Sequence, residues 1–127
     1  MLDTLKNKKN LIALVGASND PKKYGNKILL DLVSKGYNVV PINSTVDTIA
    51  GIKSCKNVLD LKESPSIINF VVPPEIGFEI TKELVENNYD NFWYQPGAES
   101  KEISYYLIEN RKNFIDDKCI MVEARLY

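Results

Sequence analysis

The sequence has no histidine, and this absence excludes several kinds of chemistry. Without histidine there is no Ser-His or Cys-His nucleophile pair, no histidine metal ligand and no phosphohistidine intermediate. Cysteine is scarce as well, because Cys55 and Cys119 are the only two and neither belongs to a CxxC pair. Two cysteines cannot build a disulfide framework, and these lack the spacing of a zinc site. We expect no catalytic residue, no metal site and two small buried thiols in a reducing compartment.

Long apolar runs and an excess of charge are also missing. The apolar stretches cover only a few residues, whereas a membrane span needs about 20, and the N-terminus shows no signal-peptide core. The net charge is −1, so no surplus of lysine and arginine favours nucleic acid. We therefore expect a cytoplasmic protein whose partners include neither nucleic acid nor a membrane.

The residues that are present have the balance of a globular protein. Hydrophobic residues make up 44% of the 127-residue chain and charged residues 26%. A chain of this length buries roughly two-thirds of its unfolded surface, which is enough for one hydrophobic core. We predict a single domain over residues 1–127.

Short apolar runs predict strands that are buried on both faces of a parallel sheet. The clearest runs are Leu11–Val15, Asn38–Ile42, Ile67–Val72 and Asn91–Tyr94. Weaker patterns predict a short strand near Ile49–Lys53, a helical turn near Val58–Leu61, and one or two strands at Phe114–Ile115 and Cys119–Val122.

Helical spacing of apolar residues appears between these strands. One helix is predicted over Gly25–Lys35, with Ile28, Leu29, Leu32 and Val33 on one side and Gly36 as its C-terminal cap. A second begins at Pro74, carries Ile76, Ile80, Leu84 and Val85, and ends near Asn87 and Asn88. A third is capped by Ser100 and carries Ile103, Tyr106 and Leu107. The alternation predicts an α/β fold: a doubly wound, mostly parallel, Rossmann-like sheet of about five to six strands flanked by helices.

The turn after the first strand is the most informative segment. Ligands of doubly wound sheets bind outside the carboxyl ends of the strands. Gly16 allows a tight turn there, and the small residues Ala17 and Ser18 let backbone amides approach an anion near the positive end of the next helix. The turn therefore predicts a site for a pyrophosphate.

Two mismatches argue against NAD as the ligand. The fingerprint G-x-G-x-x-G needs glycines where Ser18 and Pro21 stand, and no Walker A motif is present. No carboxylate follows the second strand to bind ribose hydroxyls, whereas Lys22 and Lys23 supply positive charge. A nucleotide with an additional ribose phosphate fits this pairing better, although a ligand-free turn with a solvated lysine pair stays open.

Five segments, taken together, resemble a known family. They are VGASNDPKKYG at 15–25, VVPIN at 39–43, INFVVPPE at 68–75, WYQPG at 93–97 and DKCIMVE at 117–123. Their order and spacing resemble those of the small stand-alone CoA-binding proteins, which have a Rossmann-like fold and are related to the CoA-binding domain of the succinyl-CoA synthetase α subunit. The resemblance runs from about Leu11 to Glu123.

The resemblance implies coenzyme A as the cofactor and divides its site among the turns. The first loop would cradle the pyrophosphate and meet CoA phosphates, the ends of the second and third strands would flank the adenosine, and the last turn would lie towards the pantetheine arm. The implied residues of the first loop are Gly16, Ala17, Ser18, Lys22, Lys23, Tyr24 and Gly25. Those at the two strand ends are Pro41, Ile42 and Asn43 with Val72, Pro73 and Pro74. Those of the last turn are Gln95, Pro96 and Gly97. Many relatives carry arginine in the first loop, where this chain has only lysine.

Three functional hypotheses remain at this stage. The first is non-catalytic binding of CoA or acyl-CoA at the carboxyl ends of the strands. The second is a small enzyme that uses CoA or NAD(P), such as an acyl-CoA transferase or an oxidoreductase, for which no nucleophile-base pair can be named. The third is a redox-regulated binder in which Cys119 forms a mixed disulfide with the CoA thiol.

Overall fold

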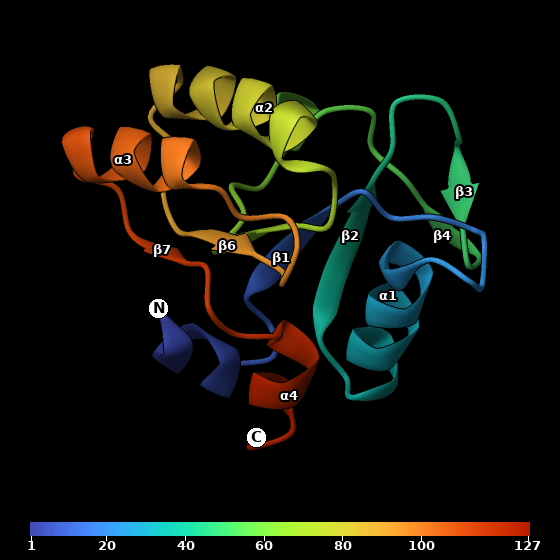
Figure 1. Ribbon diagram of the computed structural model, residues 1–127. Helices are drawn as coiled ribbons and strands as arrows, with labels where there is room; N and C mark the ends of the chain where they lie inside the picture. The colour runs from blue at the N-terminus through green and yellow to red at the C-terminus, as the bar shows by residue number, and fades with distance from the viewer.

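The computed structural model describes residues 1–127, and its centre is a five-stranded sheet in which every neighbouring pair is parallel (Figure 1). In spatial order the strands are β2 (Asn38–Ile42), β1 (Leu11–Val15), β5 (Ile67–Phe70), β6 (Phe92–Tyr94) and β7 (Phe114–Ile115). This is one of the two common orders of doubly wound sheets. The predicted α/β fold is confirmed, with five strands in the main sheet.

Helices cover both faces of the sheet. In Figure 1, α2 (Pro74–Glu86) and α3 (Lys101–Glu109) lie on one side, and α1 (Tyr24–Ser34) and α4 (Ile120–Ala124) on the other. A short 3-10 helix, Leu2–Lys6, packs with α1 and α4. None of these helices is long and apolar enough to cross a membrane.

Each face of the sheet has its own hydrophobic core. Leu14 and Trp93 pack towards α1 and α4, whereas Ala13 and Phe70 pack towards α2 and α3. All five residues of β1 are buried, as the uninterrupted apolar run predicted. The two cores hold the strand ends firmly in place, and the turns that follow those ends inherit their positions.

The ends of the helices follow the sequence signals. Gly36 has φ +86°, and its N–H donates to Val33 O at 3.0 Å while that of Tyr37 donates to Leu32 O at 3.0 Å. This pattern is a Schellman motif, so the predicted glycine cap is confirmed. Pro74 is the first residue of α2, and Ser100 Oγ accepts a hydrogen bond from Ile103 N at 3.2 Å at the start of α3.

The prediction of a strand at Cys119–Val122 is wrong, because these residues form the N-terminal cap and first turns of α4. A short apolar run fits either a strand or a buried helix. Here Ile120 and Ala124, four residues apart, are both buried in the core beside α1. The helix therefore covers the sheet instead of extending it.

Smaller differences concern element lengths and edges. The third predicted strand stops at Phe70 and not at Val72, and the one predicted near Ile49–Lys53 is a hairpin of β3 (Thr48–Ile49) and β4 (Ile52–Lys53). Its two turn residues both have positive φ, as tight hairpins require. The helical turn is a 3-10 helix, Val58–Asp60.

Two residues assigned to buried helix faces are exposed. Val33 is 41% exposed because the buried side of α1 is formed by Ile28, Leu29 and Leu32, and Val33 lies at its rim. Ile76 is 53% exposed because the side of α2 that faces the sheet is formed by Gly77, Thr81, Leu84 and Val85, and Ile76 lies outside it. The buried faces of α1 and α2 are therefore narrower than predicted, whereas the positions of the two helices in the sequence are as predicted.

Candidate functional site

The candidate site lies where the strand order changes direction, at the carboxyl ends of β1, β5 and β6. Three cavities adjoin there, and Val71 lines all of them. The loop cavity, about 530 Å³, is lined by Gly16, Ala17, Ser18, Lys22, Lys23, Tyr24, Gly25, Asn43, Val71, Val72 and Pro73. The turn cavity, about 380 Å³, is lined by Val71, Val72, Pro73, Pro74, Gln95, Pro96, Gly97 and Ala98. The side cavity, about 270 Å³, is lined by Tyr24, Ile28, Val71, Gln95, Pro96 and Cys119.

Two glycines allow the first turn to pass closely between its neighbours. Gly16 has φ +101°, and a Cβ there would lie 2.8 Å from Val72 Cγ1 and 2.9 Å from Val71 O. A Cβ on Gly25 would overlap the Gly16 carbonyl oxygen, so the first turn of α1 rests directly on the backbone of the loop. Any side chain at either position would displace the loop that lines the cavity.

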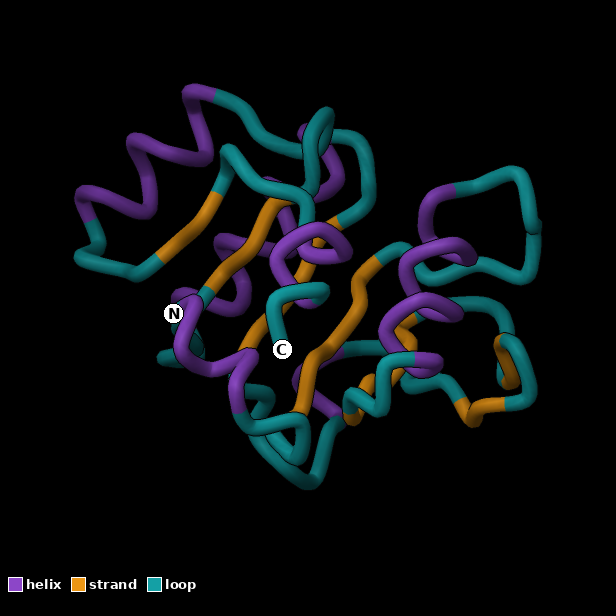
Figure 2. Tube along the Cα trace, turned by 90° about the horizontal axis from the view of Figure 1, so that it is seen from below, coloured by secondary structure: helices purple, strands orange, loops and turns teal.

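Side-chain amides fix the carbonyl groups of this loop. Asn43 Nδ2 donates to Ala17 O at 3.0 Å, and Asn26 Nδ2 donates to Ser18 O at 3.0 Å. Asn19 ties the loop to the β3–β4 hairpin, donating to Thr48 O at 2.9 Å and accepting from Ala50 N at 3.0 Å. Figures 1 and 2 show this hairpin on the same side of the molecule as α1. The loop is therefore held in one conformation from several directions.

The N–H groups of the same segment have no acceptor in the protein. The amides of Ala17, Ser18 and Asn19 make no hydrogen bond, and neither do those of Tyr24 and Gly25 at the start of α1. No side chain caps α1, and no acidic residue lies in its first turn. Unpaired amides and a positive helix end are the features that attract an anion.

Two lysines add full positive charge beside these amides. Lys22 and Lys23 are exposed, line the loop cavity and take part in no ion pair. Asp20, the nearby acid, is used within the loop, where its carboxylate accepts from Lys22 N at 2.9 Å. Both ammonium groups thus remain available to a ligand.

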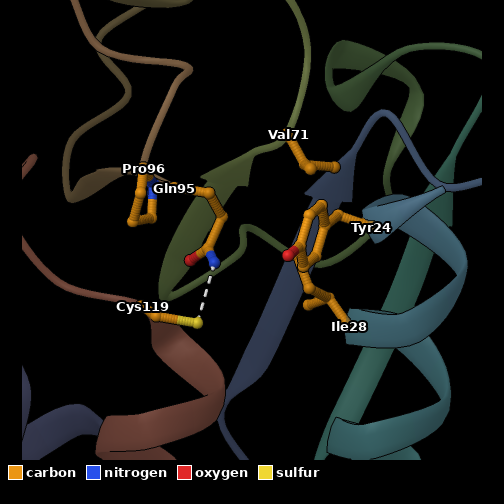
Figure 3. Close-up of a pocket in the computed structure, with 6 residues that line it drawn as sticks. All are labelled: Tyr24, Ile28, Val71, Gln95, Pro96 and Cys119. Atoms are coloured by element: carbon orange, nitrogen blue, oxygen red, sulfur yellow. Dashed lines mark hydrogen bonds between the residues drawn. The ribbon is translucent and has the colours of Figure 1, made fainter.

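The side cavity lies between the first turns of α1 and α4. Figure 3 shows Tyr24 and Ile28 on one side of it, and Gln95, Pro96 and Cys119 on the other. Gln95 is 4% exposed; its Oε1 accepts from Ile120 N at 2.9 Å, and its Nε2 donates to Cys119 Sγ at 3.2 Å. One buried amide thus holds both the start of α4 and the thiol that faces the cavity.

The three adjoining cavities are together called the groove. The structure brings most of the predicted site residues together around this groove. Only Pro41 and Ile42 line none of its three cavities. They lie inside β2, whose outer edge is covered because Cys55 N donates to Pro41 O at 2.9 Å and Asn43 N donates to Cys55 O at 2.9 Å. Among the residues predicted at the end of β2, only Asn43 lines the loop cavity.

Four lining residues were not in the predicted site: Ile28, Val71, Ala98 and Cys119. Val71 was assigned to the interior of a strand, but that strand stops one residue earlier. Ile28 belongs to the apolar face of α1, which sequence reasoning treated as core only. Cys119 was expected to be a buried thiol or a redox partner of CoA. Both cysteines are only partly buried, and Cys119 reaches the groove because α4 is a helix.

The chain is similar to known proteins along nearly its whole length. The family described as CoA binding domain matches residues 10–125. A solved structure of a conserved hypothetical protein from Pyrococcus furiosus shares 47% identity and a TM-score of 0.86, covering 90% of this chain and 98% of that one. The Bacillus subtilis protein YneT is 28% identical over 87% of this chain and 82% of its own length. The alpha subunit of the ADP-forming acetate–CoA ligase II of P. furiosus is 36% identical over 68% of this chain, which spans 18% of that subunit.

Proposed function

Because the chain belongs to the family of CoA binding domains, we propose that it binds coenzyme A, free or acylated, in the groove at the carboxyl ends of β1, β5 and β6. The observation that carries the proposal is the loop cavity, where the unpaired amides of four lining residues, an uncapped helix N-terminus and two unpaired lysines adjoin one space of about 530 Å³. The role is binding without catalysis.

The pyrophosphate belongs at the Gly16 turn. Its oxygens can accept from the amides of Ala17 and Ser18 and from the start of α1, all of which lack protein partners. The carbonyl groups of the loop already accept hydrogen bonds from Asn26 and Asn43. These bonds hold the carbonyl groups away from the anion, which their negative dipoles would repel. An anion at such a site gains both hydrogen bonds and the field of the helix.

The remaining parts of CoA fit the two ends of the groove. Lys22 and Lys23 would meet the ribose phosphate, and Val72 with Pro73 offers a rigid apolar wall for the adenine. The turn cavity along Gln95, Pro96 and Gly97 would take the pantetheine arm. Coenzyme A carries a negatively charged phosphate on its ribose, which the two lysines can bind. A ribose diol, as in NAD, has no charge to pair with them.

The end of β2 supports CoA over NAD. Asn43 is the one residue there that faces the cavity, and its side chain is already committed. Its Nδ2 donates to Ala17 O, while its Oδ1 accepts from Thr45 N and Val46 N, each at 2.9 Å. No free acceptor remains for a ribose diol, which dinucleotide-binding sheets bind with a carboxylate at this place.

An enzyme that uses CoA or NAD(P) is the second candidate function, and the groove gives it less support. Its only strong nucleophile is the Cys119 thiol, and the group hydrogen-bonded to that thiol is the Gln95 amide, which is not a base. A binding role needs no such pair.

The decisive experiment compares CoA with NAD on the intact chain. Ligand binding to the folded state raises its stability by about 2.7 kcal/mol when the ligand is at about 100 times its Kd. We expect CoA to raise the Tm clearly and NAD at equal concentration much less, with calorimetric titration giving the two affinities. Equal shifts by both ligands would contradict the proposal.

A further inference from the structure

The side cavity is not needed for any phosphate, and its walls suggest what it holds. We infer that it receives the acyl group of a short-chain acyl thioester of CoA, so that the preferred ligand is a short acyl-CoA and not free CoA. This inference rests on the proposed function, because it presumes that the rest of CoA occupies the rest of the groove. It assigns the cavity to the reactive end of that ligand.

The lining of the side cavity is mostly apolar, and its polar groups are the Tyr24 hydroxyl, the Gln95 amide and the Cys119 thiol. Ile28 is fully buried beside it, and Val71, Pro96 and the ring of Tyr24 complete most of the wall. Gln95 is the only amide there, and its two polar atoms are already bonded to Ile120 N and Cys119 Sγ. A polar group placed here would lose its hydrogen bonds to water, whereas an alkyl chain would gain by leaving water.

The side cavity branches from the rest of the groove at a suitable place. It shares Tyr24 with the loop cavity, and it shares Gln95 and Pro96 with the turn cavity. A ligand whose pyrophosphate lies at Gly16 and whose arm runs towards Gln95 passes its entrance. The Cys119 sulfur accepts from Gln95, so its own S–H is free to donate to the oxygen of a thioester. No covalent step is involved.

Size limits the acyl group. An apolar cavity of about 150 Å³ holds benzene, which has six carbons, so 270 Å³ has room for roughly ten non-hydrogen atoms. The sulfur and the adjoining methylenes of the ligand arm take some of this space. The remainder fits an acyl chain of about two to six carbons, and longer chains would have to leave the cavity.

The test is a chain-length series on the wild-type protein by calorimetric titration, using CoA and its acetyl, butyryl, hexanoyl and octanoyl thioesters. Each methylene that enters the cavity should tighten binding about fourfold, and the gain should stop near six carbons. Equal affinities across the series, with CoA itself bound, would overturn this inference alone. Failure of every ligand to bind would overturn the proposed function with it.

A matched pair of variants locates the acyl group. Cys119→Leu fills part of the cavity, and Cys119→Ala enlarges it slightly. The measured quantity is the ratio of butyryl-CoA affinity to CoA affinity, because contributions from the nucleotide end cancel in it. We expect the ratio to fall towards one in the leucine variant and to fall much less in the alanine variant, which loses only the weak S–H hydrogen bond to the thioester oxygen. A ratio that stays unchanged in Cys119→Leu would overturn the assignment; circular dichroism establishes that both variants are folded, and the wild-type series stands independently of them.

Discussion

Gly16 combines a backbone angle and a lack of space that no other residue type satisfies. We predict that Gly16→Val abolishes CoA binding in a protein that still folds, because a branched side chain resists φ +101° and collides with Val71 and Val72. Gly51→Val is the matched control, since Gly51 has φ +78° but nothing within 4 Å of its Cβ position and lines none of the three cavities. Circular dichroism and calorimetric titration decide, and undiminished CoA affinity in folded Gly16→Val would remove this turn from the site.

Lys22 and Lys23 test which group of CoA the loop binds. The double substitution Lys22→Ala with Lys23→Ala should weaken CoA roughly tenfold or more and dephospho-CoA little, so that the two affinities converge. The preference for CoA should also shrink as salt rises, because both lysines are exposed. Lys56→Ala with Lys62→Ala removes the same charge elsewhere and should leave the preference intact. A preference that survives in the Lys22 and Lys23 variant would assign the ribose phosphate to another group.

Individual residues differ in how well the sequence could predict their place at the groove. Gly16 was predictable because a tight turn after a buried strand constrains its own residue type. Val71 was not, since the end of β5 depends on where its neighbours β1 and β6 stop pairing. Pro41 and Ile42 follow the family pattern, yet the segment at Cys55 covers their strand through contacts that no local pattern encodes.

At the scale of elements, the first N–H group of α4 is bound by a residue outside the helix, Gln95. We predict that Gln95→Leu lowers the free energy of unfolding by about 1–3 kcal/mol, because Ile120 N loses its buried acceptor. Urea unfolding measures the loss, and hydrogen exchange should show faster opening of α4 in particular. Ser100→Ala is the comparison, since losing that N-cap costs about 1 kcal/mol at α3 and leaves α4 protected. Unchanged exchange in α4 of Gln95→Leu would show that the helix holds without this tether.

The same helix marks the limit of element prediction. Strands buried on both faces, such as β1, can be predicted from continuous apolar runs bounded by turn residues. In the run from Cys119 to Val122, strand and helix are equally compatible with the residues, and the tertiary contacts of Ile120 and Ala124 decide. Because Cys119 precedes that helix, the error also hid its place beside the groove.

At the scale of the whole molecule, alkaline stability depends on buried phenols. Burial raises the pKa of Tyr94 far above its usual value near 10, and burial raises that of Tyr37 as well. Above pH 10 the unfolded chain loses the Tyr94 proton while the folded protein keeps it, so unfolding becomes easier by about 1.4 kcal/mol for each pH unit. Tyr94→Phe removes the part of this pH dependence of the unfolding free energy that comes from Tyr94 and keeps the part that comes from Tyr37. In urea unfolding, the advantage of wild type over Tyr94→Phe at pH 8 should disappear by about pH 11; parallel curves would contradict the prediction.

The global arrangement was the most predictable level, because strands and helices alternate along the whole chain and each leaves its own period in the sequence. The five sequence segments also identified the family, which the match over residues 10–125 confirms. The side cavity could not be predicted from the sequence, since its walls come from α1, the turns after β5 and β6, and the start of α4, and meet only in the folded protein.

The asparagines that hold the Gly16 loop have a consequence for the timing of ligand capture. Asn19, Asn26 and Asn43 fix its backbone before any ligand arrives, so the conformational entropy of ordering the loop is lost during folding and not during association. Encounter and capture then coincide, without a slow isomerisation of the loop in between. Differences in affinity among ligands will accordingly be expressed as residence times, set by how much of each molecule must leave the groove at once.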